Sequence, residues 1–205
     1  HSGTYDPNLI EACFETTEIA VDTHLLSDLI QEAVVAHPKI ELRLNTKVDR
    51  LSGDAGHYAV HVINQDGVES SAVFSEIVNA LWANRLLIDS TLGLKPQRTW
   101  MNRLKLGLNI SPTDNAVKPW SCDLPNTTFV LGPYGDIVRF ASGRTYMSWY
   151  AAGMFGVLND MTEFNWREQF KHVNKERVVR ETIEMLKQLM PGLNVAIDDD
   201  TDIVV

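Results

Sequence analysis

A group of aromatic and basic side chains near the middle of the chain could do chemistry. Its members are Tyr134, Arg139, Arg144, Tyr146, Trp149 and Tyr150. We predict a hairpin here, with strands over Asp136–Phe140 and Thr145–Tyr150 joined by a turn at Ala141–Arg144. An arginine guanidinium can donate two hydrogen bonds to one carboxylate, and tyrosine hydroxyls add further donors. The hairpin is therefore a candidate binding site for a small carboxylate. Plain strand packing with two surface arginines is the alternative.

An acid-free basic stretch lies just before this hairpin. Residues 90–113 contain no Asp or Glu but include Lys95, Arg98, Arg103 and Lys105. In a chain of formal net charge -9, this stretch is the best candidate for meeting an anion. A solvated strand face is the alternative.

The composition excludes several classes of protein. A chain with a net charge of -9 lacks the overall basic character needed to bind nucleic acid or an anionic membrane surface. Cys13 and Cys122 form no CxxC pair, which argues against disulfides and zinc thiolates and for a reducing, cytoplasmic compartment. His57 and His61 lie four residues apart in a predicted strand, too far apart along it to share a metal ion. We therefore expect no metal site.

Sequence motifs for phosphate binding and for nucleophilic catalysis are also absent. The 12 glycines never fall as Gly-x-Gly-x-x-Gly or as a loop that ends in Gly-Lys-Ser/Thr. No Gly-x-Ser-x-Gly elbow is present either. The chain alone is therefore not expected to hold a dinucleotide, and the sequence assigns no catalytic residue.

The first half of the chain is predicted to be a helix followed by strands. Apolar residues repeat at helical spacing over Val21–Ala36, with Asp22 or Thr23 as the cap. Alternating polarity then predicts strands at Ile40–Leu44, Lys47–Leu51, Tyr58–Ile63 and Ala72–Ala80. Short, turn-rich links make these strands an antiparallel meander. Its last part, Ile77–Ala83, is expected to enter a buried sheet.

The second half is predicted to be a sheet followed by helices. A strand at Phe129–Leu131 precedes the hairpin, and a helix or helix pair runs over Thr162–Met190. Pro191 and Gly192 end that helix. We expect two domains, with residues 1–89 in the first and 90–205 in the second.

The order of these elements resembles the FAD-dependent oxidoreductases of the D-amino acid oxidase and glycine oxidase type. The features that match are the helix opening at Asp22, the Thr-Lys-Val step that ends at Val48, and the segment Ile77–Ala83. The resemblance implies that Val48 contacts the adenine end of FAD, and that Asn79, Ala80 and Trp82 lie beside the cofactor. Leu81 replaces the glycine that is usual in the last step.

The later stretch from Arg103 to Tyr150 is similar to the substrate-domain sheet that covers the flavin in that family. The substrate-binding residues that follow from this likeness are Lys105, Arg139, Arg144, Tyr146 and Tyr150. The implied fold is α+β or mixed α/β, an antiparallel substrate-domain sheet with flanking helices. Part of an FAD-binding domain would accompany it, without the N-terminal Rossmann βαβ unit.

We therefore expect the interior, substrate-side portion of an FAD-dependent oxidoreductase that acts on a small amine, amino acid or hydroxy acid. FAD belongs to the parent enzyme, and the chain alone is not expected to bind FAD or to be active. Its protein partners would be the missing N- and C-terminal FAD-binding segments, or a second copy in a homo-oligomer. Two alternatives stay open: a stand-alone module that binds a small anion or a protein, and a subunit that completes an FAD site in trans.

Overall fold

The computed structural model describes residues 3–110, 124–132, 134–158, 166–193, 195 and 202–204. The chain forms two compact units. The first unit combines His1–Asp28, Arg103–Gly156 and Phe170–Val205, and the second combines Leu29–Asn102 with Val157–Gln169. Helices accompany antiparallel strand pairs in both units, so the predicted α+β fold class is confirmed. The division into residues 1–89 and 90–205 stays a prediction.

A five-stranded sheet forms the centre of the first unit, in the order β10-β5-β8-β7-β6. The strands are β5 (Gly107–Ile110), β6 (Thr127–Phe129), β7 (Gly135–Arg139), β8 (Thr145–Trp149) and β10 (Asp202–Val204). In the β7–β8 hairpin Asp136 faces Ser148 and Val138 faces Tyr146. Phe140 N donates to Arg144 O at 2.9 Å, and Gly143 takes a φ of 86° that glycine adopts without strain. The predicted hairpin is confirmed.

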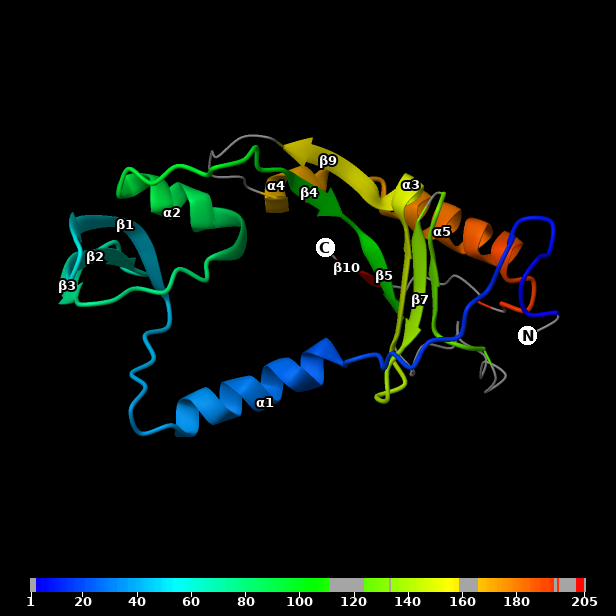
Figure 1. Ribbon diagram of the computed structural model, residues 1–205, viewed down its shortest axis with the longest axis horizontal. Helices are drawn as coiled ribbons and strands as arrows, with labels where there is room; N and C mark the ends of the chain where they lie inside the picture. The colour runs from blue at the N-terminus through cyan, green and yellow to red at the C-terminus, as the bar shows by residue number, and fades with distance from the viewer. Residues whose placement is uncertain are drawn as a thin grey trace. The chain divides into compact units, whose positions relative to one another are not determined.

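One face of this sheet is covered by α5 (Lys175–Leu189), as Figure 1 shows. Asn174 caps the helix, since its side chain accepts a hydrogen bond from Arg177 N at 2.9 Å. The apolar stripe of α5 packs on the sheet, and the core that results includes Leu108, Ile137, Met147, Trp149, Ile183 and Leu186. The predicted helix pair appears as α4 (Trp166–Lys171) and α5. The predicted start at Thr162 lies outside the described residues.

A second, two-stranded sheet pairs β4 (Asn102–Lys105) with β9 (Met154–Leu158), and the short helix α3 (Tyr150–Gly153) precedes β9. Leu106 N donates to Gly153 O at 2.8 Å. A side chain at Gly153 would collide with the carbonyl oxygen of Leu106, so only glycine allows this close approach. The contact fixes the chain immediately after Lys105.

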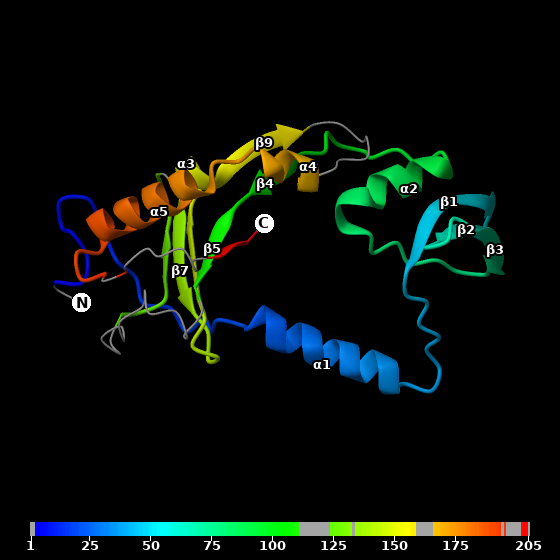
Figure 2. The ribbon, with the colours of Figure 1, turned by 180° about the vertical axis from the view of Figure 1, so that it is seen from behind.

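The second unit contains the predicted antiparallel meander, in the order β1-β2-β3. Its elements are β1 (Thr46–Asp54), β2 (His57–Asn64), β3 (Glu69–Phe74), the 3-10 turn η1 (Trp82–Asn84) and α2 (Arg85–Thr91). Figure 2 shows α2 beside β1, and Leu51 N donates to Thr91 Oγ1 at 2.9 Å. Leu51, Leu86 and Ile88 are the buried apolar residues at this contact.

Two predicted strands of this region are wrong. Residues 40–44 form no strand, and Leu44 is 71% exposed. Asn45 adopts a left-handed φ of 52°, which breaks the extended chain before β1 begins. The last meander strand ends at Phe74, and residues 75–81 form no strand or helix, with Val78 92% exposed. The 3-10 turn η1 then begins at Trp82. Alternation alone does not make a strand, because a strand also needs a neighbour that accepts its backbone hydrogen bonds.

The predicted first helix is α1 (Thr23–Ala36), and none of its residues is buried. Asp22 is the cap, since its Oδ1 accepts hydrogen bonds from His24 N at 3.1 Å and from Leu25 N at 3.3 Å. The apolar residues that predicted the helix stay solvent-accessible, with Leu25 58% and Leu29 55% exposed. None of the described helices has the length and apolar character required to cross a membrane.

Candidate functional site

The five-stranded sheet has a second face, turned away from α5. Side chains alternate along a strand, so the residues between the core positions point to this side. We call it the polar face and define it by Asn109, Asp136, Tyr146 and Ser148. Three of these four are half-buried and Ser148 is fully buried. The sheet thus presents an apolar surface to α5 and a hydrogen-bonding surface on its other side.

A cluster built around Lys105 lies at one end of the polar face. Lys105 Nζ is 3.3 Å from Asp136 Oδ2 and 3.8 Å from the centroid of the Tyr150 ring. The Tyr134 and Tyr150 rings meet edge to face, with centroids 5.6 Å apart. These contacts hold the ammonium group between a carboxylate and an aromatic wall. We call Lys105, Tyr134, Asp136, Ser148 and Tyr150 the Lys105 cluster.

Asp136 is the centre of the cluster. Its Oδ2 atom accepts a hydrogen bond from Ser148 Oγ at 2.7 Å in addition to the contact with Lys105. The Ser148 side chain is fully buried, so this bond satisfies a hydroxyl that water cannot reach. An ammonium group has three donors, and within the described ranges the structure gives Lys105 one hydrogen bond, to Asp136. The remaining donors can serve an anionic ligand.

Tyr146 lies on the same face, over β5. A side-chain carbon at Gly107 would stand 2.6 Å from Tyr146 Oη and 2.7 Å from the ring carbon that carries it. Gly107 thereby leaves the space that the tyrosine ring fills. Three of the five predicted substrate residues, Lys105, Tyr146 and Tyr150, are therefore carried on or beside one face of the sheet.

Arg144 does not join them. Its Nη2 donates to Asp22 Oδ1 at 3.0 Å, and both side chains are largely buried. Ser142 Oγ donates to Asp22 Oδ2 at 2.6 Å. The hydrogen bond from Ser142 is the main cause that lowers the pKa of Asp22, with backbone donors and the Arg144 charge acting in the same direction. Arg144 thus ties the hairpin turn to the start of α1.

Arg139 is also separated from the cluster. It pairs with Thr145 at the turn end of the hairpin, whereas Asp136 and Ser148 lie toward the other end. Asn126 holds its backbone, because Asn126 Oδ1 accepts from Arg139 N at 2.8 Å. The two arginines that suggested a carboxylate site therefore lie away from the Lys105 cluster. Their role in substrate binding stays a prediction.

The predicted cofactor residues are spread over the second unit. Val48 is half-buried in β1 and pairs with Val62. The Asn79 amide donates to Arg85 O at 3.0 Å and to Asp89 Oδ1 at 2.8 Å, which uses both of its hydrogens within the protein. Ala80 is exposed, and Trp82 is 93% exposed with a left-handed φ of 46°. Contact between these residues and a cofactor stays a prediction.

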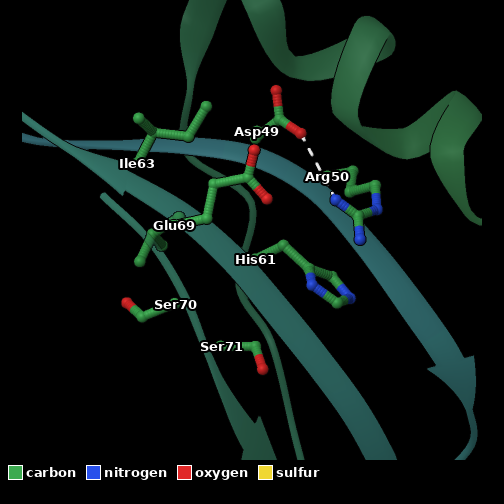
Figure 3. Close-up of a pocket in the computed structure, with 8 residues that line it drawn as sticks. Asp49, Arg50, His61, Ile63, Glu69, Ser70 and Ser71 are labelled. Carbon is green, nitrogen blue, oxygen red and sulfur yellow. Dashed lines mark ion pairs between the residues drawn. The ribbon is translucent and has the colours of Figure 1, made fainter. Parts of the chain in front are cut away.

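A pocket of about 230 Å³ does lie on the meander. Asp49 bulges out of β1 next to Val48, and Arg50 pairs with it at 3.5 Å. Figure 3 shows this ion pair beside the side chains of His61 and Glu69. Val48 itself does not line the pocket. Among the described residues, no group of three or more His, Cys, Asp and Glu side chains is placed to hold a metal ion.

Asp136 and Ser148 are site residues that sequence reasoning missed. Both stand in predicted strands, but their pairing depends on the register of the hairpin, which a slip of one residue would reverse. One signal was available, because an aspartate inside an otherwise apolar strand needs a polar partner. The serine at a matching distance from the turn could have supplied that partner.

No protein-family model and no curated protein matches the sequence. By structure, the chain is similar to p-nitrophenol 4-monooxygenase PnpA from Pseudomonas putida DLL-E4, with a TM-score of 0.52 and 17% identity. The match covers 90% of this chain and 42% of that one. A flavoprotein/dehydrogenase from Cytophaga hutchinsonii matches with a TM-score of 0.49 and 14% identity, over 89% of this chain and 40% of that one. The chain therefore spans less than half the length of these proteins and has a fold like that of part of a monooxygenase.

Proposed function

We propose that this chain is the substrate-side part of an FAD-dependent oxidoreductase that acts on a small amino acid, hydroxy acid or amine. Two observations support the proposal. The order of sequence elements resembles the D-amino acid oxidase and glycine oxidase type. The fold is similar to part of a monooxygenase over 90% of the chain.

The single observation that carries the proposal is the Lys105 cluster. Lys105 keeps donors for a ligand, while Asp136 and the Tyr150 ring hold its ammonium group in place. Tyr134 is 48% exposed, so its hydroxyl adds a donor at the rim. A preorganised cation beside tyrosines suits the carboxylate of an amino acid or hydroxy acid. In this proposal the polar face is one wall of the substrate site.

Other parts of the protein would hold the cofactor. A bound flavin would supply the electron acceptor: the carbon that bears the substrate's amine or hydroxyl group would give up the hydride of its C–H bond, the nitrogen or oxygen would lose a proton, and a C=N or C=O bond would remain. Because the sequence contains no Gly-x-Gly-x-x-Gly loop, we propose that the pyrophosphate is bound by protein outside this chain. The uncovered apolar side of α1 fits this proposal, since a helix with that pattern normally packs on something.

The test uses the protein that carries this sequence, loaded with FAD, and follows anaerobic flavin reduction by small carboxylates and amines. Lys105→Met removes a charge-assisted hydrogen bond worth about 1.5–3 kcal/mol, so the KM for a carboxylate substrate should rise by roughly 10-fold or more. The matched control, Arg177→Met, removes an exposed cation of α5, which covers the other face of the sheet, and should leave that KM unchanged. Reduction by a simple amine should be insensitive to both changes.

Two outcomes would contradict the proposal. If the protein takes up no flavin, the oxidoreductase assignment fails and a stand-alone binding module is favoured. If flavin is reduced but Lys105→Met and Arg177→Met have the same effect on KM, the chain is part of a flavoenzyme but the Lys105 cluster does not bind its substrate.

A further inference from the structure

A second concave site lies in the other unit, between α2 and the segment that follows it. Its volume is about 460 Å³, and its walls include Arg85, Asp89, Leu94, Lys95, Arg98 and Trp100. All of these residues belong to the second unit. We call this feature the α2 pocket. It contains none of the residues assigned above to the substrate or the cofactor.

The charge of the α2 pocket is strongly biased. Three cations and a single carboxylate line it, in a chain whose formal net charge is -9. The carboxylate, Asp89, already accepts a hydrogen bond from Asn79 at 2.8 Å. Lys95 and Arg98 are exposed, and neither has an ion-pair partner within the part of the chain that the structure describes. The pocket therefore attracts anions where most of the surface repels them.

Arg85 is held in place without its donors being used up. Its guanidinium carbon lies 4.7 Å from the centroid of the Trp100 ring, a cation–π contact. Its Nε is buried with no hydrogen-bond acceptor, and the nearest carboxylate oxygen, on Asp89, is 3.9 Å away. A positioned guanidinium that the protein's own acceptors leave unsatisfied is a good partner for phosphate oxygens.

The pocket also offers apolar surface. Leu94 is 56% exposed and Trp100 is 41% exposed, both at the pocket wall. The volume of about 460 Å³ falls within the range of small-molecule sites and is far larger than a phosphate ion needs. The ligand should therefore combine an anionic head with a flat apolar body.

We propose that the α2 pocket binds an aromatic phosphate monoester. Arg85, Lys95 and Arg98 receive the phosphate, and Leu94 with the exposed part of Trp100 receives the aromatic ring. The lining of this site shares no residue with the predicted cofactor contacts or with the Lys105 cluster. It would give the second unit a ligand of its own.

The test measures binding of three probes to the purified chain by isothermal titration calorimetry: AMP, adenosine and inorganic phosphate. AMP should bind about 10-fold or more tightly than either of the others, because it alone supplies both the dianion and the ring. Lys95→Gln combined with Arg98→Gln should weaken AMP about 10-fold and flatten its salt dependence. Trp100→Leu should weaken AMP more than inorganic phosphate, because AMP loses its ring contact as well as the cation–π support of Arg85.

The matched control is Arg50→Gln, which removes an exposed cation from the same unit but outside the pocket. It should bind AMP as the unchanged chain does. The proposal is overturned if AMP does not bind, if adenosine binds as tightly, or if the double variant keeps full affinity. The last result would place AMP elsewhere, for example near Val48. Lys95 and Arg98 are exposed, so circular dichroism should show the variants folded.

Discussion

The hydrogen bond between Ser148 and Asp136 is the contact whose removal gives the most sharply defined prediction. Ser148 is fully buried, and its hydroxyl donates to Asp136 Oδ2 at 2.7 Å. Asp136→Ala would leave that hydroxyl without an acceptor, which costs about 1–3 kcal/mol. Loss of the partly exposed ion pair with Lys105 adds up to about 1 kcal/mol. The free energy of unfolding should therefore fall by about 1–4 kcal/mol.

Ser148→Ala should cost less. It removes the same hydrogen bond, but Asp136 keeps Lys105 and stays accessible to water, so about 1–1.5 kcal/mol is expected. In the double variant the Ser148–Asp136 bond can be lost only once. The two single effects should therefore exceed the double effect by about 1–2 kcal/mol.

Urea unfolding at neutral pH, followed by far-UV circular dichroism, measures these differences. With a slope near 2 kcal/mol/M, Asp136→Ala should lower the midpoint by about 1 M. Ser71→Ala, an exposed serine of β3, is the matched control and should change stability by less than about 0.5 kcal/mol. Additive single effects, with a coupling below about 0.5 kcal/mol, would refute the account of Asp136 as the centre of the cluster.

Three other perturbations test the fold and its charges. Leu186→Ala, in the fully buried stripe of α5, should lower the free energy of unfolding in urea by about 2–5 kcal/mol. Leu25→Ala, on exposed α1, should lower it by less than about 0.5 kcal/mol. Similar losses for the two variants would contradict the assigned core. Because its pKa is lowered in the folded state, Asp22 stabilises the fold above the usual aspartate pKa of about 3.9 and loses this contribution as the pH falls through the lowered value. The difference in urea midpoint between the unchanged chain and Asp22→Asn should thus shrink on acidification, and a difference that grew would oppose the assigned direction. Gly153→Ala should lower the melting temperature through its collision with Leu106 O, and an unchanged melting temperature would show that this approach is not tight.

The elements that the sequence predicted well are those whose signal is local. The capped, periodic segments became α1 and α5, and the turn residues around Gly143 marked the β7–β8 hairpin. The predicted strand at residues 40–44 had the same kind of signal but found no neighbour. A helix satisfies its backbone hydrogen bonds within its own segment, so α1 forms with no buried residue, whereas a strand forms only where a neighbour accepts its backbone hydrogen bonds.

The candidate site was less predictable because it depends on distant pairs. Lys105 was identified from its basic surroundings, but its partner Asp136 is 31 residues away. Arg144 was expected to meet the substrate, and instead it bonds to Asp22, 122 residues earlier in the chain. The spacing of residues in the sequence does not show whether an arginine is available to bind a ligand or is already paired with a carboxylate of the protein.

The bare apolar side of α1 has a consequence for how the chain behaves in solution. Half-exposed leucines on one helix attract the same surface of another molecule, while the net charge of -9 pushes the molecules apart. Added salt weakens the repulsion, since the screening length is about 8 Å at physiological ionic strength, but leaves the apolar attraction in place. The isolated chain should stay dispersed in dilute buffer and self-associate as the ionic strength rises.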